Sequence, residues 1–293
     1  MSWIETLQHY PWIVLFFTTI TGLLVGSFLN VVIYRLPVMM EREWKQECRL
    51  ILEIEPPSNE NHSDWFNLAY PSSRCPSCQA PIKAWQNIPV LSYLMLRGRC
   101  HSCQTPISAR YPVIEALTGL LSFLVIWQFG ATTNGLGILV FTWSLICLTM
   151  IDIDHKLLPD QITLPLLWLG LIINSYGLLV PLEDALWGAV AGYLSLWAVY
   201  WVFKLITGKE GMGYGDFKLL AALGAWMGWQ ALPMIILLSS LVGAIIGSII
   251  LTASKKGRDT AIPFGPYLAI AGWIAMLWGD VITNSYLQFA GFK

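Results

Sequence analysis

The stretch "GLGILVFTWSLICLTMIDID", residues 135–154, holds seventeen uncharged residues and then places Asp152 and Asp154 at its end. A helix needs about 20 mostly apolar residues to cross the hydrocarbon core of a bilayer. The run is therefore typical of a membrane-spanning helix. An acidic residue in or beside such a helix is costly, and in general it faces a protein interior or a water-filled cavity. The stretch thus predicts both a membrane fold and a polar site at one end of a span.

The composition of the whole chain agrees with this interpretation. The 293 residues are 56% hydrophobic and only 12% charged, whereas soluble domains carry about a quarter charged residues. With a net charge of -1 and no basic stripe, nothing in the sequence indicates a nucleic-acid partner. We expect an all-α polytopic protein in the lipid bilayer, with about eight transmembrane helices. The predicted spans are roughly 11–34, 112–130, 135–151, 162–180, 185–206, 213–229, 232–252 and 262–283.

The basic residues predict the orientation, because Lys and Arg stay in the cytoplasmic loops. With eight spans, sixteen of the seventeen Lys and Arg residues fall on one face, and only Lys293 falls on the other. We therefore expect both termini to be periplasmic and the loops after the first, third, fifth and seventh spans to be cytoplasmic. No basic residue precedes Arg35, so the first span lacks the charged region of a cleavable signal peptide and should remain in place.

The main polar segment, residues 37–110, contains two Cys-x-x-Cys pairs. Cys75 and Cys78 form the first pair, and Cys100 and Cys103 form the second. Two such turns predict a tetrahedral four-sulfur site, for which Zn²⁺ is the usual metal; four thiolates leave no open position, so the zinc would be structural. The alternative is two disulfides, which a cytoplasmic location disfavours. The stretch 39–55 before the cysteines is typical of an amphipathic helix, either solvated or lying along the membrane surface.

Two aspartates from distant segments are predicted to meet. Asp152 lies at the cytoplasmic end of the third span and Asp216 at the cytoplasmic start of the sixth, so both reach the same depth on the same face. Asp154 should point away from this pair, because alternate helical positions lie about 200° apart. Asp160 follows a proline and precedes the fourth span, which predicts a helix N-cap.

Such a pair has a recognisable chemistry. Two close carboxyl groups share one proton, so the charged member can activate a water while the protonated member polarises a peptide carbonyl. In "GMGYGDFKLL", residues 211–220, the glycines before Asp216 would let a substrate backbone approach and would permit unusual dihedrals. The break "PFGP", residues 263–266, predicts either a proline-initiated helix or one wall of the cleft.

Two other classes of function also fit these features. Paired intramembrane carboxylates carry protons or cations in transporters, but such sites lie near the bilayer midplane and between internal repeats. Here the acids lie at one edge, and the sequence has no evident repeat. A zinc-dependent membrane anchor or assembly factor, in which the acids are structural, is the third hypothesis.

Six motifs in order resemble one family, the bifunctional bacterial type IV prepilin leader peptidases and N-methyltransferases. "GLLVGSFLNVVIYRLP" resembles the opening signature of that family, "CPSC" and "CHSC" its cysteine tetrad, and "RGRC" and "ARYPVIEALTG" the stretch that leads into the second span. "IDIDHKLLPD" and "GMGYGDFKLL" resemble its two aspartate motifs, and "PFGPYLA" its late motif. The resemblance covers nearly the whole chain.

The resemblance implies a Gly-x-Gly-Asp intramembrane aspartic protease with Asp152 and Asp216 as its catalytic residues. Such an enzyme of the inner membrane removes the basic leader of type IV prepilins and type II secretion pseudopilins on the cytoplasmic side. It then methylates the new N-terminal residue from S-adenosylmethionine. An enzyme with peptidase activity alone is the alternative within the family. No Rossmann signature marks a site for the methyl donor, and Gly98 in "RGRC" is the candidate cofactor-binding residue, or else a glycine in a turn. We expect residues 1–36 to form the first span, 37–110 the methyltransferase region, and 111–293 the peptidase domain.

Overall fold

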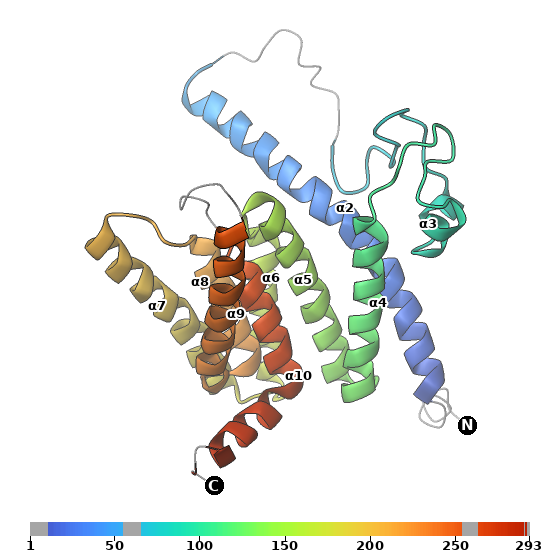
Figure 1. Cartoon of the computed structure of the whole chain (residues 1–293). Coiled ribbons are helices and arrows are strands. Elements are labelled where there is room, and N and C mark those ends of the chain that lie inside the picture. Colours follow the sequence, from blue (N-terminus) through green and yellow to red (C-terminus); the bar gives the residue numbers. More distant parts are fainter. Residues whose placement is uncertain (1–10, 55–65, 254–262, 290, 292–293) are drawn as a thin grey trace. The chain divides into compact units, whose positions relative to one another are not determined.

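The computed structural model describes residues 11–54, 66–253, 263–289 and 291 (Figure 1). The predicted basic loop with Lys255, Lys256 and Arg258 lies outside these residues, as does Lys293. Within them the regular structure is helical, and pairing of extended backbone is limited to two isolated bridges, Arg74 with Pro81 and Arg99 with Pro106. The predicted all-helical class is confirmed. The helices are α2 (Pro11–Ile51), η1 (Ala84–Asn87), α3 (Leu91–Met95), α4 (Arg110–Phe129), α5 (Thr133–His155), α6 (Asp160–Ser175), α7 (Leu182–Thr207), α8 (Tyr214–Met227), η2 (Trp229–Ala231), α9 (Leu232–Ala253) and α10 (Gly265–Phe289).

A helix occupies each of the eight predicted spans, but the eight differ in length. Six of the described helices are long and apolar enough to cross a membrane: α2, α4, α5, α7, α9 and α10. The other two are shorter, because α6 has 16 residues and α8 has 14. At 1.5 Å per residue, fourteen residues extend only about 21 Å, against about 30 Å of hydrocarbon.

The chain divides into two compact units, residues 1–127 and 128–293. In the first unit, α2 and α4 pack through small residues. A Cβ atom on Gly22 would lie 2.6 Å from Ser122 Oγ, and one on Gly26 would lie 2.7 Å from the Cα atom of Glu115. The two backbones therefore approach closely, in the manner of the small-residue interfaces of membrane helices.

The helix α2 continues well beyond its apolar part, through Pro37 to Ile51. Residues 39–51 of the predicted amphipathic segment 39–55 are thus helical, as its spacing predicts, and they extend α2 without a break, whereas residues 52–54 follow the helix and Glu55 lies outside the described residues. At the junction, the buried Arg35 donates hydrogen bonds to the carbonyls of Asn67 (2.9 Å) and Pro71 (2.6 Å). These bonds attach the segment that leads into the cysteines to α2.

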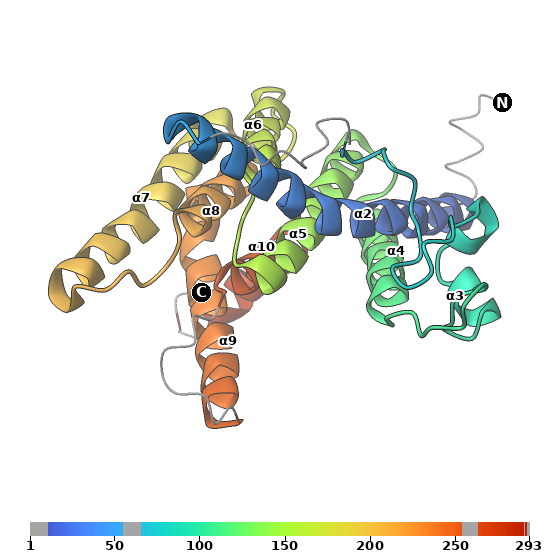
Figure 2. The same cartoon turned by 90° about the horizontal axis from the view of Figure 1, so that it is seen from above.

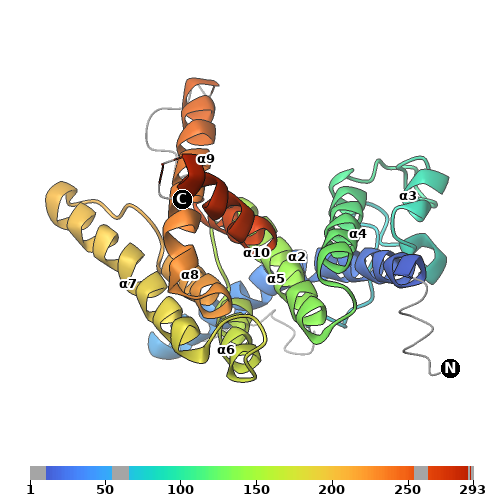
Figure 3. The ribbon, with the colours of Figure 1, turned by 90° about the horizontal axis from the view of Figure 1, so that it is seen from below.

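In the second unit, α8 is enclosed by its neighbours, since it contacts α6, α7, α9 and α10. Figure 2 shows α7 and α8 side by side, and Figure 3 shows α10 beside α5. A short helix is stable in this position because its apolar side chains meet other helices. The buried residues of α8 are Asp216, Phe217, Leu219, Leu220, Ala221, Ala222, Leu223, Gly224, Ala225 and Trp226.

Glycines set the spacing of α7 and α8. Gly188 lies directly against the backbone of Gly224, and a Cβ atom on Gly192 would lie 2.6 Å from the carbonyl oxygen of Leu220. The two backbones are in contact, with no side chain between them at these points. Larger residues at these positions would separate the helices.

The far end of α8 is fixed to α6 by hydrogen bonds. The fully buried Trp226 donates its indole N–H to the carbonyl of Leu166 at 2.8 Å. The amide of Asn174 donates to the carbonyl of Ala225 at 2.9 Å. Buried polar groups paired in this way specify one arrangement of helices, because leaving either unpaired costs free energy.

Candidate functional site

Asp152 lies in the last turn of α5 and is 4% exposed. The helix ends three residues later, where Lys156 adopts the left-handed conformation and donates its backbone N–H to the carbonyl of Asp152. The side-chain atom Asp152 Oδ2 is buried and has no hydrogen-bond partner among the described residues. A buried carboxylate oxygen without a partner is unusual in a folded protein, and it is expected where a substrate or water binds.

Asp216 lies in the first turn of α8 and is 6% exposed. Gly213 is the N-cap of that helix, and the Asp216 side chain interacts with the Gly213 backbone. The Asp216 carboxyl group therefore lies near the start of α8, the end of a helix at which negative charge is favoured. Asp216 also interacts electrostatically with Asp152. The structure therefore brings the two sequence-predicted acids together, from the end of α5 and the start of α8.

The start of α10 forms a third side of this site. Gly265 is the first residue of α10, and its backbone interacts with the Asp152 carboxyl group. A Cβ atom on Gly265 would lie 2.6 Å from Asp152 Oδ2 and 3.1 Å from Leu158 Cδ1. The break at residues 263–266 thus places a helix N-terminus against the carboxylate, which is where negative charge is favoured.

The three glycines before Asp216 have different environments, and none of them has a positive φ. A Cβ atom on Gly215 would lie 2.8 Å from that of Leu158, and one on Gly211 would lie 2.9 Å from the Phe203 ring. These two glycines are required by close packing. Gly213 faces open space, with its nearest neighbouring atom 4.0 Å away. The prediction of unusual backbone dihedrals is therefore wrong for these three glycines. Close packing explains Gly211 and Gly215, and Gly213 lies beside open space.

The remaining two aspartates lie away from the pair. Asp154 is exposed at the end of α5. Asp160 is the first residue of α6 rather than its N-cap, which is Pro159. Its two carboxylate oxygens accept from Lys218 Nζ at 2.8 and 2.7 Å, and this ion pair links the starts of α6 and α8. The N-cap prediction for Asp160 is thus wrong, since the backbone already turns at the proline.

The four predicted metal ligands form one cluster in the first unit. The sulfur atoms of Cys75, Cys78, Cys100 and Cys103 all lie within 4.8 Å of one another, and Cys75 and Cys103 are 3.8 Å apart. A tetrahedral site with Zn–S bonds of 2.3 Å has sulfur atoms about 3.8 Å apart. All four cysteines are free thiols. The cluster therefore fits a metal ion and does not contain the alternative disulfides.

Two matching turns produce this geometry. The N–H of Cys75 donates to the carbonyl of Ala80, and the N–H of Cys100 donates to that of Thr105, at 3.0 and 2.9 Å. Each turn continues through a glutamine of positive φ, Gln79 or Gln104. The two sequence pairs thus fold into near-identical loops that point four sulfur atoms at one centre.

The thiols of the cluster differ in acidity. Hydrogen bonds with the side chain and backbone of Thr105 lower the pKa of Cys103 to about 6. The backbone hydrogen bond with Ala80 lowers the pKa of Cys78, but desolvation and the neighbouring thiols together outweigh it and raise that pKa to about 11. At neutral pH the cluster therefore holds both a thiolate and a protonated thiol, and a bound cation would have to displace the remaining protons.

The amino-acid sequence matches two family descriptions and several well-covered relatives. Residues 20–129 match the bacterial peptidase A24 N-terminal domain, and residues 139–248 match the type IV leader peptidase family. The chain is 59% identical to the prepilin leader peptidase/N-methyltransferase of Stutzerimonas stutzeri over 290 residues, 99% of each chain. It is 59% identical to that of Pseudomonas aeruginosa over the whole of both chains, and 56% identical to that of Aeromonas salmonicida over 285 residues. The chain belongs to the prepilin leader peptidase/N-methyltransferase family. No solved structure matches it.

Membership in the prepilin leader peptidase/N-methyltransferase family makes the chain a multi-pass membrane enzyme and confirms the resemblance seen in the motifs. The same membership decides between the classes of function that the sequence left open, because relatives this similar over their full lengths are named as enzymes and not as transporters or anchors.

Gly98, the predicted cofactor-binding residue, has a conformation that already requires glycine. Its φ is +67°, and a Cβ atom there would lie 2.9 Å from the Tyr93 hydroxyl. Its carbonyl accepts from the Ile107 N–H at 2.8 Å. The turn before the second cysteine pair thus accounts for this glycine, and a role toward the methyl donor stays a prediction for a prepilin peptidase of this family.

Proposed function

We propose that the chain removes the leader of type IV prepilins and type II secretion pseudopilins with Asp152 and Asp216, and that it then methylates the new N-terminus. The single observation that carries the peptidase assignment is the meeting of these two acids. Both are buried, they interact electrostatically, and Asp152 Oδ2 has no partner in the described part of the chain. Asp154 and Asp160, by contrast, are exposed.

The chemistry follows from two carboxyl groups that share one proton. The ionised member takes a proton from a water, and the resulting hydroxide attacks the carbonyl carbon of the scissile peptide bond. The protonated member hydrogen-bonds to the carbonyl oxygen and stabilises the charge that develops there. The C–N bond then breaks, and the leaving amine takes the proton that the first member accepted from the water, which restores the shared-proton pair. Asp152 lies against the N-terminus of α10 and Asp216 lies in the first turn of α8, so both members of the pair lie at helix ends where negative charge is favoured.

The open space at Gly213 suits a peptide substrate. The residue is the N-cap of α8, three positions before Asp216, and neither its extended backbone nor its packing requires glycine. A substrate backbone can therefore approach the dyad at this point without meeting a side chain. The substrate's apolar stem would remain in the bilayer while its basic leader lies on the cytoplasmic side.

We place the dyad at the cytoplasmic face of the inner membrane, with both termini periplasmic and eight crossings. The distribution of Lys and Arg supports this orientation. In this topology α6 and α8 cross as short helices inside the bundle, and the enclosed position of α8 supports that reading. The peptidase domain is 111–293, and the segment 1–36 is the first span.

The cytoplasmic segment 37–110 would carry the methyltransferase and a structural zinc ion held by the four cysteines. The 3.8 Å spacing of Cys75 and Cys103 supports zinc. S-adenosylmethionine, when bound, supplies an electrophilic methyl group to the new N-terminal amine. Gly98 is our candidate for its binding residue, since a turn without a side chain lets a cofactor approach the backbone.

The test uses the purified full chain, a prepilin and three matched variants. Asp152→Asn and Asp216→Asn should each abolish leader removal, because a neutral amide can neither activate the water nor share the proton. Asp154→Asn, which makes the same chemical change two residues away, should cleave normally. Circular dichroism and methylation of an already cleaved pilin would show that the variants fold. Cleavage by either dyad variant at the wild-type rate would disprove the assignment.

A further inference from the structure

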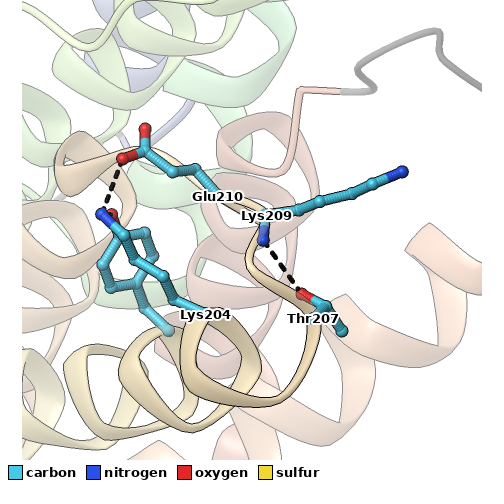
Figure 4. A network of polar contacts seen from close by, with 5 residues as sticks. Lys204, Thr207, Lys209 and Glu210 are labelled. Carbon is cyan, nitrogen blue, oxygen red and sulfur yellow. Dashed lines mark hydrogen bonds and ion pairs between the residues drawn. The ribbon is translucent and has the colours of Figure 1, made fainter.

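The loop that connects α7 to α8 leads into the first turn of α8, which carries Asp216, and an ion pair holds the middle of this loop. The loop starts at Gly208, which ends α7 in the left-handed conformation. Lys204 Nζ donates to Glu210 Oε1 at 2.8 Å, and Thr207 Oγ1 accepts from the Lys209 N–H at 3.2 Å (Figure 4). The ion pair thus connects the last turn of α7 to a residue six positions before Asp216.

The same lysine contacts Tyr200, whose ring packs against aromatic residues on both sides of Asp216. Lys204 Nζ donates to the Tyr200 hydroxyl at 3.1 Å. The Tyr200 ring lies 5.4 Å from that of Tyr214 and 5.7 Å from that of Phe217, so it touches residues on both sides of the catalytic acid. A closed circuit therefore runs from Lys204 to Glu210, along the backbone to Phe217, and through Tyr200 back to Lys204. Asp216 lies on this circuit.

The ion pair is not a major source of fold stability. Its side chains are 34% and 70% exposed, and pairs in such positions contribute little to the free energy of unfolding. The loop that it fastens contains three glycines, Gly208, Gly211 and Gly213, and most of its residues are exposed. Segments with few buried contacts are the ones that open most easily. The pair therefore adds a restraint to a segment that has few buried residues.

We propose that Lys204 and Glu210 are positioning residues for leader cleavage, because their ion pair holds the loop 208–213 in the conformation that directs Asp216 toward Asp152. This inference rests on the proposed function of the dyad. When the pair is broken, the loop samples other conformations and Asp216 is correctly placed for a smaller fraction of the time. Catalysis depends steeply on such placement. The defect should therefore lie in kcat, while substrate binding is kept.

The experiment measures kcat and KM of leader removal by the full-length enzyme. Lys204→Met and Glu210→Gln should each lower kcat by about three- to tenfold with KM unchanged. The double variant Lys204→Glu with Glu210→Lys restores an ion pair of reversed sign and should recover most of the rate. Lys209→Met, in the same loop and with the same loss of charge, is the matched control and should keep the wild-type kcat, because its side chain points away from Glu210 (Figure 4).

Three results would overturn the inference. A wild-type kcat in Lys204→Met would show that the pair does not position the dyad. A raised KM with unchanged kcat in Glu210→Gln would show that Glu210 binds the basic leader instead. Failure of the reversed pair to recover activity, in a variant that still methylates cleaved pilin, would show that the pairing is not what matters. Each of these requires a wild-type enzyme that cleaves, whereas an inactive wild type would refute the proposed function itself.

Discussion

Replacing Gly265 with alanine should disable the peptidase without unfolding it. The added Cβ atom would lie 2.6 Å from Asp152 Oδ2, about 0.8 Å inside the 3.4 Å at which ordinary contact begins. Leu158 Cδ1, at 3.1 Å, blocks a second direction of escape. Asp152 must therefore turn away from its position at the start of α10.

The size of the effect follows from this displacement. A misplacement of about 1 Å in a catalytic group costs roughly a hundredfold in rate, which corresponds to about 2.7 kcal/mol of transition-state stabilisation. Gly265 does not have a positive φ, so its backbone conformation is one that alanine can adopt and the helix itself should not suffer. We expect Gly265→Ala to lower kcat for leader removal about a hundredfold, with a nearly unchanged thermal unfolding temperature.

The assay compares leader removal from a prepilin by Gly265→Ala and by Gly279→Ala. The control lies in the same helix, and its new methyl group would meet only the flexible end of Met234 at 3.3 Å. It should cleave at the wild-type rate. If Gly265→Ala also cleaves at that rate while remaining folded, then the contact between α10 and Asp152 has no part in catalysis, and the reasoning is refuted.

Three further predictions concern the cysteines and the ion pair of α6 and α8. Cys100→Ser should lose the zinc ion, measured as metal per protein by mass spectrometry, whereas Cys48→Ser should keep it because Cys48 is exposed and lies outside the cluster. The zinc affinity of the wild type should rise with pH above 6. The pKa of Cys78 is raised to about 11, and its proton must leave when zinc binds. A wild type without zinc, or a zinc affinity that does not change with pH, would contradict this. Lys218→Met removes the ion pair with Asp160, whose side chains are 30% and 49% exposed, and should change the free energy of unfolding by less than about 1 kcal/mol. A loss of several kcal/mol in a denaturant titration would show that this pair is a structural bond of α8.

Much of the architecture is readable in the sequence because the bilayer imposes a simple rule. Long apolar runs predicted all eight helices, and the position of Asp152 and Asp216 at the ends of two runs predicted that they would meet. The two Cys-x-x-Cys pairs likewise predicted the cluster, since their spacing leaves each pair only one tight turn. These features depend on local pattern and on depth in the membrane.

The details that depend on packing were beyond such patterns. No periodicity shows that Gly265 faces Asp152, because the contact joins residues more than a hundred positions apart. The contact of Glu210 with Lys204 likewise depends on how the intervening loop folds, which no sequence pattern shows. The apolar run of the first span ends near residue 34, yet α2 continues to Ile51, because Pro37 does not stop the helix there.

The contact of the α7 and α8 backbones has a mechanical consequence. Where glycine meets glycine, as at Gly188 and Gly224, no side chain can change rotamer to let one helix slide past the other. The two helices should therefore move as one rigid unit along these contacts, whereas the first turn of α8, which carries Asp216, lies beyond them. Space for an incoming peptide must then come from movement at other helix–helix interfaces, where side chains can change rotamer.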